Sequence, residues 1–352
     1  MQIVELAETE NDNNQGNSWK RFIKNNESLI IHTPEFRSLV EKSFSCKSHY
    51  LAAIENQEIK AIFPFFHINH KIFGKKVISV PFLEYGGPCG ESRYIPDMLN
   101  YIYGKYLNVD YIEVRQGIEN KDFDTVLGKL MKKNTEYKRF VLKLDKEEII
   151  WKNLDKQKRK AIKNAAEHGI VVKDISEKEM PEFYKLYLKN MRAFGSPPYS
   201  KRFFSNFFKH MVNNGLGKVI GAYYNQKLIS ALVGYCYKER IHIIISVSDD
   251  KFLSYRPNEA VHWHFIKYAI ANNYKYFDFG RVREGSGQFR FKKEWGCELK
   301  DLNHYYLLIK AKQIPHIDPD NIRYKLIIKI WKRLPIKATK VLGPWLRKGL
   351  GI

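Results

Sequence analysis

The sequence predicts an α+β protein whose two halves follow the same order of helices and strands. In the second half, strand-like segments at 217–225, 227–238 and 240–249 are joined by polar turns at Asn225–Gln226 and Lys238–Glu239, which indicates an antiparallel meander. A helix, a strand, a short helix or turn and a last strand come after it. The first half shows this order more loosely, and helices and strands mixed in this way indicate α+β layers.

Length and composition support two folded domains. The chain has 352 residues, of which 44 % are apolar, so each half can bury a core of its own. We expect a first domain at 1–145, a second domain at 146–310 and a tail of different composition at 311–352.

The first domain is predicted to alternate short helices and strands. Thr33 followed by Pro34 is a favourable helix start, because threonine caps the first turn and proline suits the first helical position. The expected helices are 18–26, 33–44 and 94–107. The expected strands are 50–68 with a polar turn at 55–57, the start of 75–90, 109–116 and 137–144.

The second domain is predicted to begin with one long helix at 147–169. Ile150, Leu154 and Ile162 recur there at helical spacing, and Gly169 ends the segment. Besides the meander, the expected strands are 170–176, 274–280 and 298–310, and the expected helices are 178–194, 200–215 and 256–273.

The tail combines positive charge with apolar residues. From residue 310 onward it holds eleven Lys and Arg residues against two Asp, and apolar residues at 326, 327, 330, 331 and 334 recur at helical spacing. Basic amphipathic helices with tryptophan lie in the headgroup region of anionic membranes. The alternative is a helix packed on the body of the protein with a solvated basic face.

Overall charge and cysteine usage restrict the partners and the compartment. The net charge of +22 favours polyanionic partners such as nucleic acid, nucleotide phosphates or anionic lipid headgroups. The four cysteines have no zinc-ligand spacing, and His262 and His264 point to different faces of a helix, so no metal site is expected. Without a secretory signal or a long apolar run, the sequence favours a cytoplasmic protein with free thiols.

The segment 277–296, FDFGRVREGSGQFRFKKEWG, is the strongest candidate site. Asp278 is an acid at the end of a buried strand, where sites form in layered α/β structures. Gly280 permits a sharp turn, and the N–H groups at the start of the next helix can hold an anion. The residues that could bind a substrate there are Arg281, Arg283, Gly285, Ser286, Gly287, Arg290 and Lys292. The alternative is a turn with a few solvated cations.

Three further segments carry candidate binding residues. Lys156, Arg159 and Lys163 repeat on one face of the 147–169 helix and could bind phosphate, although a solvated charge run is the simpler interpretation. Arg192 and Tyr199 flank a proline-stiffened loop that could line an acceptor site, and Tyr85 before two glycines could do the same in the first domain.

Segment 277–296 and the preceding SYRPNEAVHWHFIKYAIANNYKY resemble FemAB-like proteins of the GNAT superfamily, in particular the branch associated with exosortase/PEP-CTERM and exopolysaccharide loci. The resemblance extends to 154–170, 187–204 and 331–351. It implies tandem GNAT-like domains that transfer an acyl or aminoacyl group to an amine. Within it, SYRPNEAV stands where the superfamily usually has its acetyl-CoA loop, and there is no inserted helical arm.

Acyl transfer needs a base for the amine, donors for the oxyanion and a proton for the leaving group. The candidate bases are Asp278, Glu259 and Glu294, with Asp278 best placed by sequence. Tyr255 is the candidate proton donor, because a tyrosine has this role in many GNAT enzymes. The backbone of a splayed strand can supply the oxyanion donors.

We therefore predict an acyl- or aminoacyltransferase that acts at the cytoplasmic face of the membrane. Its acceptor would be an amine of a lipid- or nucleotide-linked saccharide or a peptidoglycan-type peptide precursor, and its donor acyl-CoA, acyl carrier protein or aminoacyl-tRNA. Two alternatives remain: a non-catalytic component of exopolysaccharide assembly that binds glycan or anionic lipid, and a protein that binds tRNA or another RNA.

Overall fold

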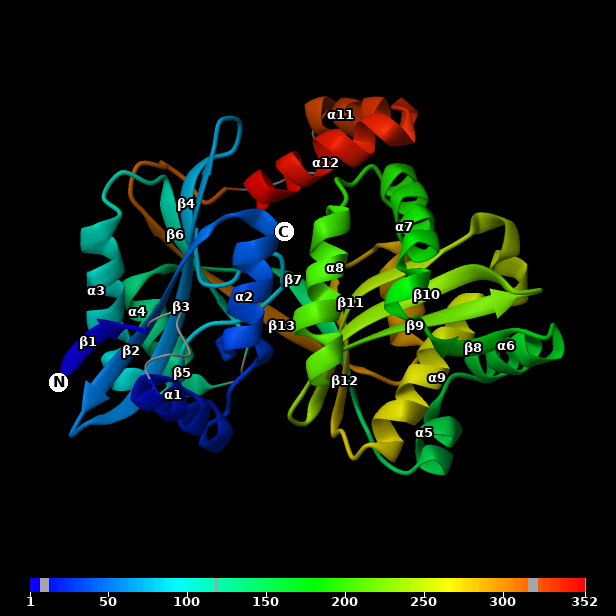
Figure 1. Ribbon diagram of the computed structural model, residues 1–352, viewed down its shortest axis with the longest axis horizontal. Coiled ribbons are helices and arrows are strands. Elements are labelled where there is room, and N and C mark those ends of the chain that lie inside the picture. The colour runs from blue at the N-terminus through cyan, green and yellow to red at the C-terminus, as the bar shows by residue number, and fades with distance from the viewer. Residues whose placement is uncertain (7–12, 118–119, 316–321, 352) are drawn as a thin grey trace. The chain divides into compact units, whose positions relative to one another are not determined.

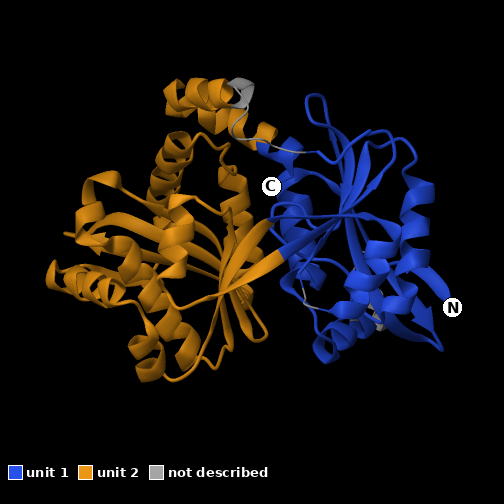
Figure 2. Ribbon diagram, turned by 180° about the vertical axis from the view of Figure 1, so that it is seen from behind, with its two compact units in different colours: residues 1–136, 302–317, 347–352 blue, residues 137–301, 318–346 orange. Residues whose placement is uncertain are grey.

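A computed structural model describes residues 1–6, 13–117, 120–315 and 322–351. The chain divides into two compact units (Figure 2). Unit 1 comprises residues 1–136, 302–317 and 347–352, and unit 2 comprises residues 137–301 and 318–346. Both contain a mostly antiparallel sheet with helices packed against it (Figure 1).

The unit boundaries differ from the expected domain boundaries because two strands pair outside their own half. Residues 138–143 of β7 (Lys132–Lys143) pair with β12 (Tyr276–Val282), so unit 2 begins at residue 137 rather than at 146. Residues 303–308 of β13 (Glu298–Leu308) pair with β6 (Tyr111–Gln116), so they belong to unit 1.

Unit 1 has the strand order β1-β2-β3-β4-β6-β13, in which only β4 and β6 are parallel. Its other strands are β1 (Gln2–Glu5), β2 (Lys47–Glu55), β3 (Glu58–His70), β4 (Gly74–Ile78) and the short β5 (Cys89–Gly90). Its helices are α1 (Asn13–Asn25), α2 (Pro34–Phe44), α3 (Ile95–Lys105) and α4 (Lys121–Leu130). Thr33 caps α2 as expected by accepting from the N–H of Phe36.

Unit 2 has the strand order β7-β12-β11-β10-β9-β8, in which only β11 and β12 are parallel. Its remaining strands are β8 (Val171–Asp174), β9 (Gly217–Tyr224), β10 (Lys227–Tyr237) and β11 (Arg240–Ser248). The predicted meander β9-β10-β11 is confirmed, and its turn residues Asn225, Gln226 and Lys238 have positive φ.

The helices of unit 2 cover both faces of its sheet. They are α5 (Glu147–Asn153), α6 (Lys156–Glu167), α7 (Met180–Phe194), α8 (Lys201–His210), α9 (Pro257–Ala271), α10 (Gly287–Lys293), α11 (Ile322–Arg333) and α12 (Ile336–Leu350), whose last residues belong to unit 1. In β10, Gly234 faces Phe265 of α9, whereas the next residue, Tyr235, contacts Phe207 of α8. Because successive strand residues face opposite sides, α8 and α9 lie on opposite faces.

The prediction of one helix over 147–169 is wrong, because the segment forms two helices, α5 and α6. Leu154 between them has an extended backbone, with φ −63° and ψ 146°. The carboxylate of Asp155 then accepts from the N–H of Gln157 and caps α6. An aspartate at this position favours a new helix start over a continuous helix.

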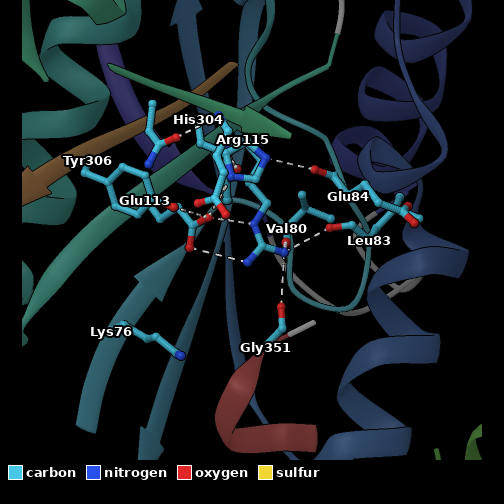
Figure 3. Close-up of polar contacts among 12 residues, drawn as sticks. Lys76, Val80, Leu83, Glu84, Glu113, Arg115, His304, Tyr306 and Gly351 are labelled. Atoms are coloured by element: carbon cyan, nitrogen blue, oxygen red, sulfur yellow. Dashed lines mark hydrogen bonds and ion pairs between the residues drawn. The ribbon is translucent and has the colours of Figure 1, made fainter. Parts of the chain in front are cut away.

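Unit 1 encloses a buried polar cluster around Arg115 (Figure 3). The Arg115 guanidinium lies 2.8 Å from Glu113, and Glu113 also accepts from the hydroxyl of Tyr306 and lies 3.2 Å from Nδ1 of His304. Burial by itself raises the pKa of Glu113, but Arg115 and His304 outweigh it and hold that pKa well below its usual range.

Arg115 and the nearby Lys76 also bind the backbone of residues 350 and 351. Nη1 of Arg115 donates to three carbonyl oxygens, those of Val80, Leu83 and Gly351. The buried ammonium of Lys76 donates to the carbonyl of Leu350 at 3.0 Å. The backbone of these two residues is therefore tied to unit 1, with Gly351 buried and Leu350 half-buried.

Candidate active site

Strands β11 and β12 run parallel but separate after a short paired stretch. They pair only where Arg240, Ile241 and His242 lie opposite Tyr276, Phe277 and Asp278. Beyond this point β11 continues on β10 as far as Ser248, whereas β12 pairs with β7 through Arg281 and Val282. We call the separated parts, residues 243–248 and 279–282, the splay.

Irregularities in the strands on each side account for the splay. The register between β10 and β11 shifts so that Val233 pairs with Ile245 and Gly234 with Ile243, which leaves Ile244 without an opposite residue. A bulge of this kind bends its strand and increases its twist. In β12 the register shifts between Asp278 and Arg281, where Gly280 has a φ of +73° that glycine adopts without strain.

Asp278 is buried at the point where the two strands separate. Its Oδ2 lies 2.7 Å from Nη1 of Arg139 on β7 and 3.6 Å from Nη1 of Arg240 on β11, and its Oδ1 accepts from the N–H of Gly280. The residue is fully excluded from solvent. Oδ2 thus links β7 and β11 to β12, whereas Oδ1 binds a backbone N–H of β12 itself.

A second charged cluster joins α6, α9 and the end of α10. Nζ of Lys158 lies 3.1 Å from Glu294 and 3.5 Å from Glu259, and it sits over the ring of Phe291 at 4.0 Å. Only 2 % of the Lys158 side chain is exposed. A buried ammonium is tolerated when carboxylates and aromatic faces compensate for the lost water, as they do here.

The two carboxylates of this cluster differ in their access to solvent. The side chain of Glu294 is 30 % exposed, against 10 % for Glu259. Glu294 is also approached at 3.5 Å by Nε of Arg290, whose own side chain is largely exposed. A substrate arriving from solvent can therefore reach Glu294 more readily than Glu259.

His262 connects this cluster to the splay. It follows Glu259 by one helical turn on α9, and its ring stacks on Phe279 of β12 at 5.6 Å. Its Nδ1–H donates to the carbonyl of Asn258. Burial lowers the pKa of His262 to about 3, so the ring is neutral at physiological pH. Within the part of the chain that the structure describes, no group of three or more His, Cys, Asp or Glu residues is arranged to hold a metal ion.

This geometry agrees with the comparisons to known proteins. Residues 152–293 match the family model described as acetyltransferase (GNAT) domain, a segment that holds β11, α9 and β12. The chain has a tandem GNAT fold. The predicted fold class is thereby confirmed.

Solved structures support the same assignment at low sequence identity. The structure of FemX matches with a TM-score of 0.70 and 11 % identity, covering 88 % of this chain and 98 % of FemX. The C-terminal domain of a putative lysylphosphatidylglycerol synthetase from Agrobacterium fabrum matches with a TM-score of 0.59 and 10 % identity, covering 84 % and 92 %. A tandem GNAT protein from the clavulanic acid biosynthesis pathway matches with a TM-score of 0.57 and 7 % identity, covering 89 % and 99 %. No curated protein sequence matches this chain.

Within the GNAT domain, Tyr255 lies next to the start of α9. It ends a short 3₁₀ helix (Asp250–Tyr255) and is followed by Arg256 with a φ of +59° and by Pro257 at the first turn of α9. The half-buried ring of Tyr255 stacks on His168 at 4.6 Å and meets Tyr224 edge-on.

Arg281 at the end of β12 and Lys292 on α10 each have a protein partner close by. Nζ of Lys292 donates to the carbonyls of Gly280 and Arg281 at 3.0 and 2.9 Å, so it secures the end of the strand. The Arg281 guanidinium lies over the ring of Tyr137 at 4.6 Å. Asp278, Arg281 and Lys292 therefore gather near the end of β12, but their charged groups bind different partners.

The glycine-containing loop caps its own helix. Ser286 Oγ accepts from the N–H of Phe289 and donates to the carbonyl of Arg283, while Gly285 and Gly287 are exposed. The helix that follows, α10, has only seven residues. The N–H of Phe289, which the sequence suggested for anion binding, is thus hydrogen-bonded to Ser286 instead.

The remaining candidates separate into packed and exposed residues. Arg159 caps α5 by donating to the carbonyls of Lys152 and Leu154, whereas Lys156 and Lys163 are exposed. Arg192 points to the carbonyl of Leu334 at 3.5 Å. Tyr199 and, in unit 1, Tyr85 are both 2 % exposed, which points to packing roles for the two rings.

Sequence reasoning missed Lys158, Arg139 and Arg240. Lys158 had a readable signal: it lies four residues after Leu154 and four before Ile162, on the apolar stripe that predicted the helix. A lysine on a buried stripe requires a compensating partner. Nothing local marked Arg139 and Arg240, because their shared partner Asp278 is distant in sequence.

Proposed function

We propose that this protein is an acyl- or aminoacyltransferase that forms an amide on an amine of a cell-envelope saccharide or peptidoglycan-type precursor. The observation that carries the proposal is the splay between β11 and β12 in the GNAT domain, with the Lys158–Glu259–Glu294 cluster beside it. The resemblance to an exopolysaccharide-associated branch stays a prediction, as does the peptidoglycan-type acceptor.

The backbone of β11 suits an extended acyl donor. Past His242 its edge toward β12 pairs with no strand among the described residues, so its N–H and C=O groups can pair with the amide groups of a donor arm. The same N–H groups can stabilise the oxyanion that forms on the attacked carbonyl. We propose acyl-CoA as the donor, since GNAT domains use it; acyl carrier protein and aminoacyl-tRNA are alternatives that the experiment below separates.

The chemistry requires one proton to leave the amine and one to reach the leaving group. The amine nitrogen bonds to the carbonyl carbon, and the carbon–sulfur bond of the thioester then breaks. Glu294 takes the amine proton, since it is the more accessible carboxylate of the cluster. Tyr255 gives a proton to the departing thiolate.

The remaining residues position this machinery. Lys158 holds Glu294 and Glu259 in place, and Asp278 ties β7, β11 and β12 together instead of acting as the base. Lys156 and Lys163, both exposed on α6, are proposed to bind phosphate of a lipid- or nucleotide-linked acceptor. A lipid-linked acceptor would place the reaction at the inner face of the cytoplasmic membrane.

The test is transfer by purified protein with each donor in turn. Acyl-CoA, acyl carrier protein and charged tRNA are incubated separately with lipid-linked precursors, and the product mass is followed. We expect an amide product with one donor, and Glu294→Gln to slow its formation by about 100-fold or more. Glu298→Gln, an exposed glutamate nearby, is the matched control and should leave the rate unchanged.

Both outcomes of this test are informative. If no donor gives a product, the transferase proposal fails and a non-catalytic component that binds glycan or anionic lipid is favoured. If a product forms equally fast with Glu294→Gln, transfer stands but Glu294 is not the base.

A further inference from the structure

Helices α11 and α12 each have one packed face and one exposed apolar face. On α11, Trp331 is buried, and Ile328 lies so close to Gly195 after α7 that a Cβ there would clash. On α12, Thr339 is buried and Gly343 closely approaches Pro198. Both helices are thus seated on the α7–α8 region, where Figure 1 shows them.

The exposed faces carry large apolar side chains. On α11, Leu326, Ile327 and Ile330 are 56 %, 61 % and 53 % exposed, and on α12, Val341, Leu342 and Trp345 are 74 %, 46 % and 44 % exposed. At about 100° per residue, each set of three spans an arc of about 100° that points away from the packed residues. We call these two arcs the apolar strips.

Positive charge borders both strips. Residues 321–352 contain nine Lys and Arg residues and no Asp or Glu. The exposed cations of the two helices are Lys325, Lys329, Lys332, Arg333, Lys337 and Lys340. At about 100° per residue, Lys329 and Arg333 lie within about 60° of Leu326 and Lys337 within about 40° of Val341, so these three border the strips, and the other three lie farther round the helices. An exposed apolar strip flanked by lysines matches the surface of a bilayer that contains anionic lipids, with acyl chains for the strip and phosphates for the lysines.

We propose that α11 and α12 dock this protein on the surface of an anionic membrane. The strips enter the boundary between headgroups and acyl chains, and the flanking lysines bind lipid phosphates. A bilayer is favoured over nucleic acid because five of the six strip residues are aliphatic, whereas nucleic-acid surfaces present rings for stacking. Among the described residues, no helix is both long and apolar enough to cross a membrane, so the contact is a surface one.

This inference deepens the membrane location given in the proposed function but depends on its own observations. The test is sedimentation of the full-length protein with vesicles of phosphatidylcholine alone or with about one third phosphatidylglycerol. Wild-type protein should bind the anionic vesicles at least about tenfold more tightly, because each lysine near such a surface adds attraction. The triple variant Leu326→Gln, Ile327→Gln, Ile330→Gln should lose about tenfold or more of this binding.

A matched control uses exposed apolar residues elsewhere. Ile72→Gln with Val171→Gln removes side chains that are 63 % and 61 % exposed, and this variant should bind as wild type does. Equal binding of wild type and the triple variant would overturn the inference, since it would mean that the lysines alone bind the anionic lipids and the strips do not enter the bilayer. So would equal binding to both vesicle types, or tighter binding to single-stranded RNA than to vesicles.

The assay contains neither donor nor acceptor, so it separates the two proposals. Wild-type protein that fails to bind anionic vesicles but transfers to a water-soluble acceptor would refute docking alone. Vesicle binding without transfer from any donor would refute the transferase and leave docking intact.

Discussion

Nζ of Lys158 lies 3.1 Å from Oε2 of Glu294, and this contact joins the start of α6 to the residue that ends α10. Glu259 on α9 completes the cluster at 3.5 Å. One buried ammonium thus fixes two carboxylates from separate helices beside the splay. Removing it leaves Glu259 buried without its counter-charge.

Replacing Lys158 with methionine should therefore destabilise the fold. We expect Lys158→Met to lower the free energy of unfolding by about 3–5 kcal/mol, because breaking a buried ion pair leaves an uncompensated charge. Urea unfolding measures this change. Lys160→Met, at an exposed position of the same helix, is the control. An unfolding free energy equal to that of wild type would show that the cluster is solvated.

A double variant refines this prediction. Lys158→Met with Glu259→Gln removes both charges, and it should be more stable than Lys158→Met alone. Methionine fills a volume close to that of the lysine stem, so packing is similar in both proteins. If Glu259→Gln lowers the free energy of unfolding further, the destabilisation by Lys158→Met comes from packing and not from the unpaired charge.

Asp278→Asn separates a positioning role from a catalytic one. We expect a loss of about 3 kcal/mol in unfolding free energy, because Arg139 stays buried without its carboxylate. Adding Arg139→Met should recover part of that loss. If Asp278 were the base, Asp278→Asn would in addition abolish transfer by the folded protein.

The buried His262 should make the free energy of unfolding fall in acid. Burial lowers its pKa from 6.5 to about 3, so the unfolded chain binds a proton between these values and the folded chain does not. The stability that comes from burying the neutral ring is fully present above pH 6.5. As the pH drops from 6.5 toward 3, the free energy of unfolding falls by up to about 1.4 kcal/mol per pH unit. Unfolding free energies at pH 7, 6 and 5 measure the slope.

The matched variant is His262→Phe, which keeps a ring next to Phe279 but cannot bind a proton. Its baseline stability is lower, since the carbonyl of Asn258 loses the hydrogen bond from the ring N–H. Its slope should nevertheless be shallower than that of wild type. Parallel slopes for the two proteins would place the acid sensitivity elsewhere, for example at His49 or His67, whose pKa values burial also lowers.

Local signals made most of the fold predictable from the sequence. The turns at 225–226 and 238–239 fall between alternating strands, and Thr33 with Pro34 marks the start of α2, so each could be read within a few residues. The break at Asp155 was also readable, because aspartate is a frequent N-cap. Leu154 and Ile162, on either side of Asp155, keep helical spacing, and this spacing favoured the prediction of one continuous helix.

The arrangement of the candidate site could not be predicted in the same way. Lys158 and Glu259 are 101 residues apart, and Arg139 and Asp278 are 139 apart, so their pairing depends on the completed sheet. The sequence identified Asp278 correctly as a buried strand residue, but β12 continues beyond it to Val282, so this acid does not lie at the strand end. The sequence could not show that the carboxylate of Asp278 is already paired with two arginines, Arg139 of β7 and Arg240 of β11.

In unit 1, Arg115 should control access to the end of the chain. It donates to the carbonyl of Gly351, and that residue follows the trypsin-sensitive bonds after Arg347 and Lys348. Arg115→Met removes this hydrogen bond and also the guanidinium that pairs with Glu113, so the segment opens more often. We expect cleavage after residues 347 and 348 to be at least about tenfold faster, because cleavage follows the population of the open form. Mass spectrometry of timed digests measures the rate, and Lys75→Met beside the buried Lys76 is the control. Equal cleavage rates in wild type and Arg115→Met would mean that packing, and not the arginine, holds the end of the chain.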